Sequence, residues 1–317
     1  MTRKEEQMEM ALATTIYCLV SSGMMLSNKL AIRDFPLECS LVWVQLFFTA
    51  VFLVAFALPY VHIGSYRDFF RWSLVAPMYT GMLLTSILAL KNAPMSLVIV
   101  LRNASPLGTL IFERFYPDPL RVSWMMLLSM MCMLAGAMIY MSDRPEPFNW
   151  RGVWWVVLNS ALAVVDRLLQ RLLLSKDQYP VDISNSGITL INNVIGMVPV
   201  GFVVIMNGEL NALPAAVAHL DGWGKMNIFI TCVLGLAISY TSIWAQSLIT
   251  ATSFLVMTNA NKFLIIIFEA WGGMFGMSNV QVLGASMTIV GCIVYGKARK
   301  DIEMEGERSQ LLPTKCG

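Results

Sequence analysis

Long apolar runs separated by short polar segments are the dominant pattern along this chain. A helix needs about 20 apolar residues to cross the hydrocarbon core of a bilayer, and ten runs come close to or exceed that length. Because the runs are continuous and do not alternate with polar residues, they predict transmembrane helices and not a β-barrel. The ten predicted spans are residues 10–30, 38–60, 70–90, 95–113, 121–141, 150–174, 183–206, 224–247, 252–272 and 278–296.

Composition agrees with a membrane environment and excludes several classes of soluble protein. Hydrophobic residues make up 57% of the 317 residues and charged residues only 13%, whereas an average soluble domain has roughly 25% charged residues. So few charges cannot cover the surface of a soluble enzyme or keep a chain disordered. The formal net charge of +2 provides no basic surface for nucleic acid. We therefore expect an all-α membrane protein with ten transmembrane helices.

The distribution of Lys and Arg predicts how these spans are oriented. With ten spans both termini lie on one side, and that side collects thirteen Lys and Arg residues against six on the other. Because cytosolic loops are enriched in positive charge, we expect both termini to be cytosolic. The first span is too long for the apolar region of a signal peptide, so we expect it to be retained as a helix.

Two short sequence matches indicate an internal repeat with an offset of 156 residues. Residues 103–105 (Asn-Ala-Ser) align with residues 259–261 (Asn-Ala-Asn), and residues 111–113 align with residues 267–269, both Ile-Phe-Glu. Each predicted half contains five spans, so the second half would enter the membrane from the opposite side. Inverted repeats of this kind are typical of secondary transporters that work by alternating access.

The repeat predicts two domains and a tail. Residues 1–141 would form the first five-helix repeat, residues 142–296 the second, and residues 297–317 a cytosolic tail. In inverted-repeat transporters the substrate binds near the bilayer midplane at the interface of the repeats. We therefore expect the substrate site in that position.

Polar side chains within the apolar spans are the candidates for substrate binding. A charge at the bilayer centre costs about 2.5–3.5 kcal/mol unless a partner or a water-filled cavity receives it. Lys262 and Arg102 lie too deep in their spans to snorkel easily to the interface. Cationic groups accompanied by amides and hydroxyls favour an anionic solute, such as a diphosphate, over a cation. The candidate set is Lys29, Arg102, Asn103, Asn192, Asn193, Ser239, Tyr240, Asn259, Asn261 and Lys262.

Structural roles are the alternative for some of the charged residues. Arg102 can instead pair with Glu113 or Asp166 as a buried bridge, and Asp166 and Arg167 can satisfy one another. Lys29 and Glu113 lie near span ends, where a charged side chain reaches the interface at little cost. Both kinds of role therefore stay open at these positions.

The sequence does not indicate metal or covalent chemistry. The six Cys residues form no CxxC pair, the chain has two His residues, and no paired acids lie at mid-membrane. We therefore expect neither a disulfide framework nor a zinc site. We also expect no catalytic residues, no cofactor and no enzyme activity.

Three segments within the predicted spans carry a family resemblance. Residues 190–193 read Leu-Ile-Asn-Asn, residues 258–262 read Thr-Asn-Ala-Asn-Lys, and residues 238–244 read Ile-Ser-Tyr-Thr-Ser-Ile-Trp. In this order, they resemble the nucleotide-sugar transporters of the drug/metabolite transporter superfamily, and most of all the GDP-mannose transporters. The first segment is similar to the family's FYNN motif with both Asn kept, and the second to its GALNK motif with the final Asn-Lys kept. Residues 27–29 and 101–103 also look like family features.

The resemblance implies roles for the candidate residues. Asn192 and Asn193 would contact the guanine base, and Lys262 would hold the phosphate or the adjoining sugar. The residues that would orient the remainder of the substrate are Ser239, Tyr240, Asn259 and Asn261.

The resemblance also implies a Golgi antiporter that carries GDP-mannose into the lumen in exchange for GMP. Its partners would be the nucleotide sugar, the nucleoside monophosphate and the lipid bilayer, with a homodimer as an open alternative and no nucleic acid. Within the superfamily, a UDP-sugar, GDP-fucose or a sugar phosphate is an alternative substrate. A transport-inactive membrane sensor or scaffold, whose tail docks a partner, is an alternative of a different class.

Overall fold

The protein is predominantly helical over the residues that its computed structural model describes, which are 3–92, 95–117, 119, 121–142, 150–271 and 278–311. A helix lies at each of the ten predicted segments, and an isolated bridge pairs Ile63 with Ile183. The elements are α1 (Arg3–Asp34), α2 (Glu38–Phe56), η1 (Leu58–Tyr60), α3 (Tyr66–Ser73), α4 (Ala76–Asn92), α5 (Met95–Glu113), α6 (Trp124–Ser142), α7 (Trp150–Leu174), α8 (Asn185–Met206), α9 (Glu209–Ala218), α10 (Gly222–Leu248), α11 (Ala251–Trp271) and α12 (Asn279–Leu311).

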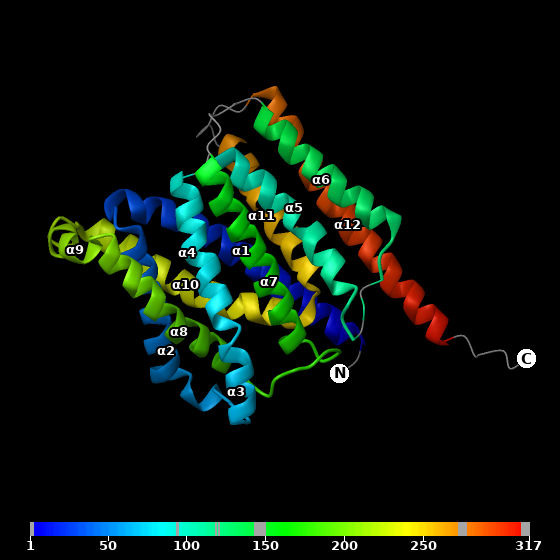
Figure 1. The fold of residues 1–317 in the computed structure, drawn as a ribbon, viewed down its shortest axis with the longest axis horizontal. Helices are drawn as coiled ribbons and strands as arrows, with labels where there is room; N and C mark the ends of the chain where they lie inside the picture. Colours follow the sequence, from blue (N-terminus) through cyan, green and yellow to red (C-terminus); the bar gives the residue numbers. More distant parts are fainter. Residues whose placement is uncertain are drawn as a thin grey trace, which may run out of the picture. The chain divides into compact units, whose positions relative to one another are not determined.

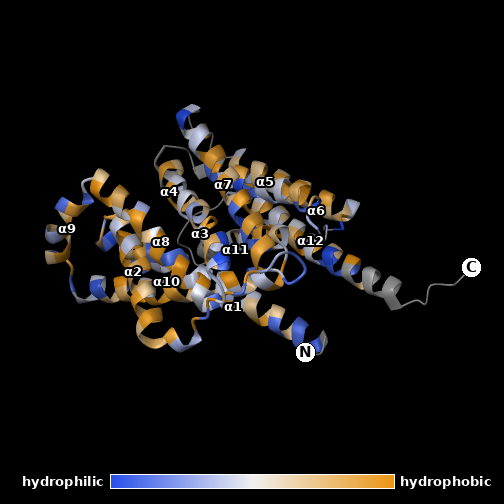
Figure 2. Cartoon of the chain, turned by 60° about the horizontal axis from the view of Figure 1, so that its bottom comes forward, coloured by the Kyte–Doolittle hydropathy of each residue, from blue (hydrophilic) through white to orange (hydrophobic). Residues whose placement is uncertain are grey.

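Seven of the described helices are long and apolar enough to cross a membrane, namely α1, α2, α6, α7, α8, α10 and α12. Figure 2 shows hydrophobic residues along these long helices, whereas hydrophilic residues gather at the N-terminal end of α1. The chain is therefore a multi-pass helical membrane protein.

The third predicted span, residues 70–90, is divided between α3 and α4. Pro77 is the second residue of α4. A proline cannot donate to the carbonyl four residues earlier, and its ring clashes with that carbonyl. That residue is Ser73, the last residue of α3, so the helical hydrogen bond across the junction of α3 and α4 cannot form.

The chain forms two compact units. Unit 1 contains residues 1–85 and 165–250, and unit 2 contains residues 86–164 and 251–317. Each unit therefore draws residues from both predicted repeats, and α4 and α7 contribute residues to both units.

Unit 1 is built around α1 packed on α10 and α2 packed on α8 and α10. One of its cores surrounds Trp72 of α3, which is fully buried among Ile188 and Ile191 of α8 and Ile243 of α10. Large apolar side chains thereby fix α3 against the helix that carries the two predicted base-binding asparagines.

In unit 2, α6 and α12 run side by side (Figure 1). Glycines allow this close packing, because a Cβ added to Gly136 would lie 2.6 Å from the carbonyl oxygen of Gly284. Thr288 also donates its hydroxyl to the carbonyl of Met133, at 3.3 Å. Small residues that let backbones approach are typical of helix pairs in membranes.

Two helices of unit 2 contain the segments that the sequence repeat relates. α5 (Met95–Glu113) and α11 (Ala251–Trp271) carry the short sequence matches at the offset of 156 residues. The same offset aligns Asn103 with Asn259, and the Asn259 amide donates to the carbonyl of Arg102 at 2.9 Å. The two repeat-related helices are therefore neighbours within this unit.

Candidate functional site

A partly open cavity of about 270 Å³ lies inside unit 1, lined by residues of α1, α2, α4, α7, α8 and α10. Its polar wall includes Tyr17, Asn28, Gln45, Tyr79, Arg167 and Asn193. Arg167 is the single charged side chain among the described lining residues. A concave site with a few convergent polar groups is the usual form of a small-molecule site.

Asn192 and Asn193, on the α8 face that packs inside unit 1, are both buried. Trp72 donates its indole N–H to Oδ1 of Asn192 at 2.9 Å. Asn193 donates its Nδ2 to the main-chain carbonyl of Thr189 at 2.7 Å. Each of the two predicted base-binding residues is thus held by one specific hydrogen bond.

Both asparagines line a small recess of about 10 Å³, and Asn193 also lines the larger cavity. Ser239 lines the recess and the cavity, so unit 1 brings it together with the asparagines. Tyr240 follows on α10 but lines neither space, and 37% of it is exposed.

Arg167 is the cavity residue that sequence analysis considered only as a partner of Asp166. Its Nε lies 3.7 Å from Oδ2 of Asp166, and its Nη1 donates to Oε1 of Gln170 at 3.2 Å. Gln170 in turn donates to Oδ1 of Asp166 at 2.9 Å. The side chain of Arg167 is 13% exposed and lines both spaces, while Asp166 is fully buried. Buried partners thus hold this cation at the cavity wall, where it can also bind an anion.

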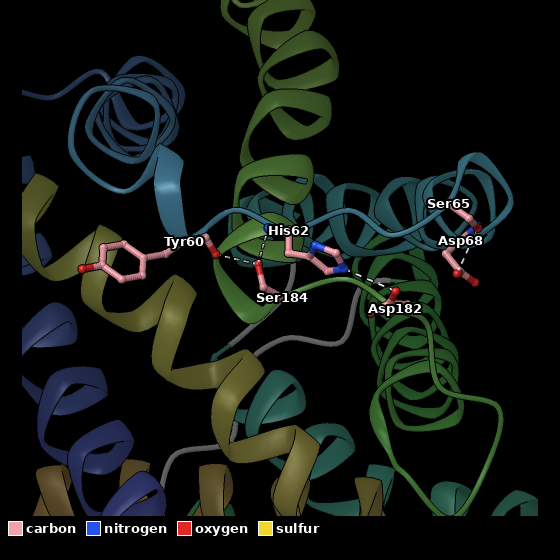
Figure 3. Close-up of polar contacts among 6 residues, drawn as sticks. All are labelled: Tyr60, His62, Ser65, Asp68, Asp182 and Ser184. Atoms are coloured by element: carbon pink, nitrogen blue, oxygen red, sulfur yellow. Dashed lines mark hydrogen bonds and ion pairs between the residues drawn. The ribbon is translucent and has the colours of Figure 1, made fainter.

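The helix that carries the asparagines is positioned by contacts between two loops of unit 1, which we call the loop clasp (Figure 3). The clasp joins residues 60–64 to residues 182–184. The main-chain N–H of Ser184 donates to the carbonyl of His62 at 3.0 Å, and Nε2 of His62 lies 3.3 Å from Oδ2 of Asp182. Because α3 follows one loop and α8 follows the other, the clasp fixes the starts of both helices.

Ser184 is the central residue of the clasp and the N-cap of α8. Its hydroxyl donates to the carbonyl of Tyr60 at 2.9 Å and accepts from the main-chain N–H of His62, also at 2.9 Å. It also accepts from the N–H of Gly187 at 3.1 Å, which satisfies one of the free donors at the helix start. The donor and both acceptor sites of the hydroxyl are therefore used.

The short helix α3 is fixed at both ends by polar contacts. Ser65 caps its first turn by accepting from the N–H of Asp68, and Arg71 donates to the carbonyl of Tyr179 at 2.7 Å. Desolvation raises the pKa of the Asp68 carboxyl, but hydrogen bonds with Ser65, the backbone of Asp182 and Arg71 outweigh it and lower the pKa overall. The ionised carboxylate accepts from Arg71 at 3.1 Å.

In unit 2, Arg102 is held by neutral acceptors. Its Nη2 donates to the hydroxyl of Ser86 at 2.7 Å and to Oδ1 of Asn159 at 3.3 Å. Asn103, Asn259 and Asn261 of the predicted site are buried in the same unit.

Glu113 has a structural role that sequence analysis did not assign. Its buried carboxylate accepts from the main-chain N–H groups of Ala251 and Thr252 at 2.8 and 3.4 Å, and from the hydroxyl of Thr252. A carboxylate at a helix N-terminus satisfies free N–H groups and interacts favourably with the helix dipole. Glu113 is therefore a cap for α11.

Two of the predicted site residues have side chains outside the described residues. Lys29 lies in α1 and Lys262 in α11. Their predicted contacts with substrate stay predictions. Among the described residues, no group of three or more His, Cys, Asp or Glu could hold a metal ion.

No protein-family model matches the chain. The GDP-mannose transporter GONST3 of Arabidopsis thaliana is 22% identical over 88% of this chain and 76% of its own length. The GDP-fucose transporter 1 of the same plant is 24% identical over 80% and 75%, and the GDP-mannose transporter GONST1 is 25% identical over 78% and 76%. The resemblance to nucleotide-sugar transporters is confirmed. A crystal structure of a protein with 14% sequence identity matches the fold of this chain, with a TM-score of 0.69 over 95% of this chain and all of that one.

Proposed function

We propose that this protein is a nucleotide-sugar antiporter that brings GDP-mannose into the Golgi lumen in exchange for GMP. The observation that carries this proposal is the likeness to GDP-sugar transporters over most of the chain. The cavity in unit 1 supports it, because its polar wall joins one cation to amides and hydroxyls. Such a wall suits a phosphorylated, hydrogen-bonding solute better than a cation.

We further propose ten transmembrane spans in two inverted five-helix repeats, residues 1–141 and 142–296, with cytosolic termini. The short sequence matches at an offset of 156 residues, which lie in α5 and α11, support the repeat. Alternating access would follow from rocking of repeat-related elements about the substrate site.

The asparagines and Arg167 have distinct roles in this proposal. Asn192 and Asn193 contact the base, Ser239 orients the substrate beside them, and Arg167 attracts a phosphate oxygen. The remaining sequence candidates are proposed substrate contacts that rest on the resemblance: Lys29, Arg102, Asn103, Tyr240, Asn259, Asn261 and Lys262.

Exchange in place of one-way transport would follow from the proposed role of Lys262 as a deep cation that contacts the substrate. Cations that face an empty cavity in a low-dielectric core are costly unless an anion accompanies them. A bound phosphate relieves this cost, so the loaded carrier changes conformation more readily than the empty one. GDP-mannose and GMP carry similar charge near neutral pH, so their exchange moves little net charge.

Proteoliposomes test the proposal. Vesicles loaded with GMP should take up labelled GDP-mannose, and vesicles without an internal nucleotide should not. Arg167→Ala should lower uptake at least about tenfold, as expected when a charge-assisted hydrogen bond is lost. Arg151→Ala, at an exposed position of the same helix, should leave uptake unchanged. Full uptake by the Arg167 variant would remove that residue from the site, and no exchange by the unmodified protein would refute the function.

GDP-fucose is the second candidate substrate, because one of the similar proteins is a GDP-fucose transporter. Competition of unlabelled GDP-fucose and UDP-sugars against labelled GDP-mannose ranks these substrates. Thermal stabilisation of the purified protein by nucleotide sugars without exchange would instead favour a membrane sensor.

A further inference from the structure

A polar hollow of about 510 Å³ opens beside α3, next to the loop clasp of unit 1. The helices α2 and α7 end shortly before the two loops of the clasp, and α8 begins directly after one of them. Each of these three helices is long and apolar enough to cross a membrane, so the hollow lies at a surface of the bilayer. Its described lining residues are all different from those of the cavity that Asn193 lines.

The short helix α3 turns an apolar stripe outward. Tyr66, Phe70 and Leu74, the last of them at the C-cap, are spaced four residues apart and share one helix face. They are 85%, 64% and 75% exposed, whereas Trp72 on another face is fully buried in the core. A helix with an outward apolar face at the ends of membrane spans is typical of an interfacial helix, whose apolar face enters the boundary between headgroups and acyl chains.

Two arginines of α3 lie beside this stripe and line the hollow, Arg67 and Arg71. Arg71 is fixed in place, because it donates to Oδ1 of Asp68 at 3.1 Å and to the main-chain carbonyl of Tyr179 at 2.7 Å. A guanidinium has five N–H donors, so Arg71 keeps up to three for another acceptor. Arg67 is exposed, and no residue in the described part of the chain bonds or pairs with it.

The charges around the hollow leave one cation uncompensated. Its described lining contains the two arginines and a single carboxylate, Asp68. That carboxylate is matched by Arg71 and by the hydroxyl of Ser65, which donates to its Oδ2 at 3.1 Å (Figure 3). The charge of Arg67 is therefore available to a ligand. Guanidinium groups recognise phosphate through parallel hydrogen bonds, so the hollow suits a phosphate group that carries net negative charge.

We propose that this hollow binds the headgroup of an anionic phospholipid. The phosphate contacts Arg67 and the remaining N–H groups of Arg71, and the acyl chains pass along the stripe of Tyr66, Phe70 and Leu74. A free anion would use the arginines alone, whereas a lipid also uses the apolar stripe beside them. With the cytosolic termini proposed above, α1 and α2 return the chain to the cytosolic surface at this point, and that leaflet carries the anionic lipids.

Phosphatidylserine and phosphatidylcholine with identical acyl chains provide a matched test, because both contain the phosphate but only the first has a net negative charge. Native mass spectrometry of the purified full-length protein in detergent measures the apparent dissociation constant for each lipid. Phosphatidylserine should bind about fivefold more tightly, the effect expected of one basic residue near an anionic lipid. Equal affinities for the two lipids would overturn the inference.

Arg67→Ala tests the site itself. Because Arg67 is exposed and has no described partner, the variant should unfold at the temperature of the unmodified protein while its preference for phosphatidylserine falls toward one. Arg33→Ala removes an exposed arginine at the other end of the α1–α2 hairpin and should keep the preference. Undiminished preference in the Arg67 variant, or an equal loss in both variants, would remove the lipid from this hollow.

Two soluble competitors distinguish the lipid from other sources of phosphate. Inorganic phosphate and GMP, each at millimolar concentration, should leave phosphatidylserine bound, because neither can use the apolar stripe. Displacement by inorganic phosphate would make the hollow a site for free anions, and displacement by GMP alone would make it a nucleotide site. Either result would overturn the lipid assignment. The measurement needs no transport, so its outcome is independent of the proposed function.

Discussion

Removing the carboxylate of Glu113 should destabilise the protein more than removing the exposed charge of the neighbouring residue Arg114. This side chain is only 2% exposed, and it accepts three hydrogen bonds at the start of α11. Ala251 and Thr252, which donate them, are themselves buried. In the native structure these donors therefore depend on the carboxylate, and removing it leaves them without that partner.

The magnitude follows from the bonds that are lost. A hydrogen bond to a charged group contributes about 1.5–3 kcal/mol, and a buried donor without a partner costs about 1–3 kcal/mol. These contributions overlap, so Glu113→Ala should lower the free energy of unfolding by about 3–5 kcal/mol. Glu113→Gln keeps one carbonyl acceptor but loses the favourable charge at the helix N-terminus, so about 1–2 kcal/mol is expected.

Thermal unfolding in detergent tests the expected order of stability among the Glu113 variants. One kcal/mol corresponds to about 2–4 °C for proteins of 150–250 residues, so the Ala variant should unfold at least about 6 °C below the unmodified protein. The unfolding midpoint of the Gln variant should lie between those of the Ala variant and the unmodified protein. Arg114→Ala, at the exposed neighbouring position, should shift the midpoint by less than about 1 °C, since exposed charges contribute little. An Ala variant that unfolds at the same temperature as this control would refute the capping role.

Two further stability predictions use the same assay. Gly284→Ala should lower the free energy of unfolding by about 1–3 kcal/mol, because its Cβ would lie 2.6 Å from the carbonyl oxygen of Gly136 and overpack the helix contact. Gly296→Ala in the same helix should be tolerated, because no atom lies within 4 Å of the new Cβ. Ser184→Ala should lower the free energy of unfolding by about 1–2 kcal/mol, because it removes the cap of α8 and the hydrogen bonds of the loop clasp. Ser142→Ala removes one local hydrogen bond at an exposed position and should lower it less. Equal midpoints within either pair would contradict the corresponding contact.

Sequence analysis located helices well because the apolar runs are long and end at polar or proline-containing segments. One exception is the break between α3 and α4, which falls at Pro77, and another is α9, which lies between two predicted spans. Apolar residues continue on both sides of this proline, so hydropathy alone extends the span across it.

The candidate site was only partly predictable, since its residues depend on tertiary contacts. Asn192, Asn193 and Ser239 could be found because a family motif marks two of them and a similar segment the third. Arg167 was visible as a charge within a span, but its neighbour Asp166 suggested a closed pair. Side-chain packing leaves the cation at the cavity wall, and sequence spacing does not contain that information. Trp72 reaches Asn192 across 120 positions of the chain, a pairing that no local pattern predicts.

Through the loop clasp, the loops that precede α3 and α8 help to position Trp72 and Asn192. Trp72 and Asn192 belong to α3 and α8, and each helix begins close after one of the loops that the clasp joins. Loosening the clasp would let α3 shift on α8, and the 2.9 Å bond between Trp72 and Asn192 is sensitive to such a shift. Ser184→Ala should therefore weaken competition by GMP against labelled GDP-mannose as well as lower stability. A variant that loses stability but binds GMP as tightly as the unmodified protein would show that the apolar core around Trp72 suffices to orient the amide.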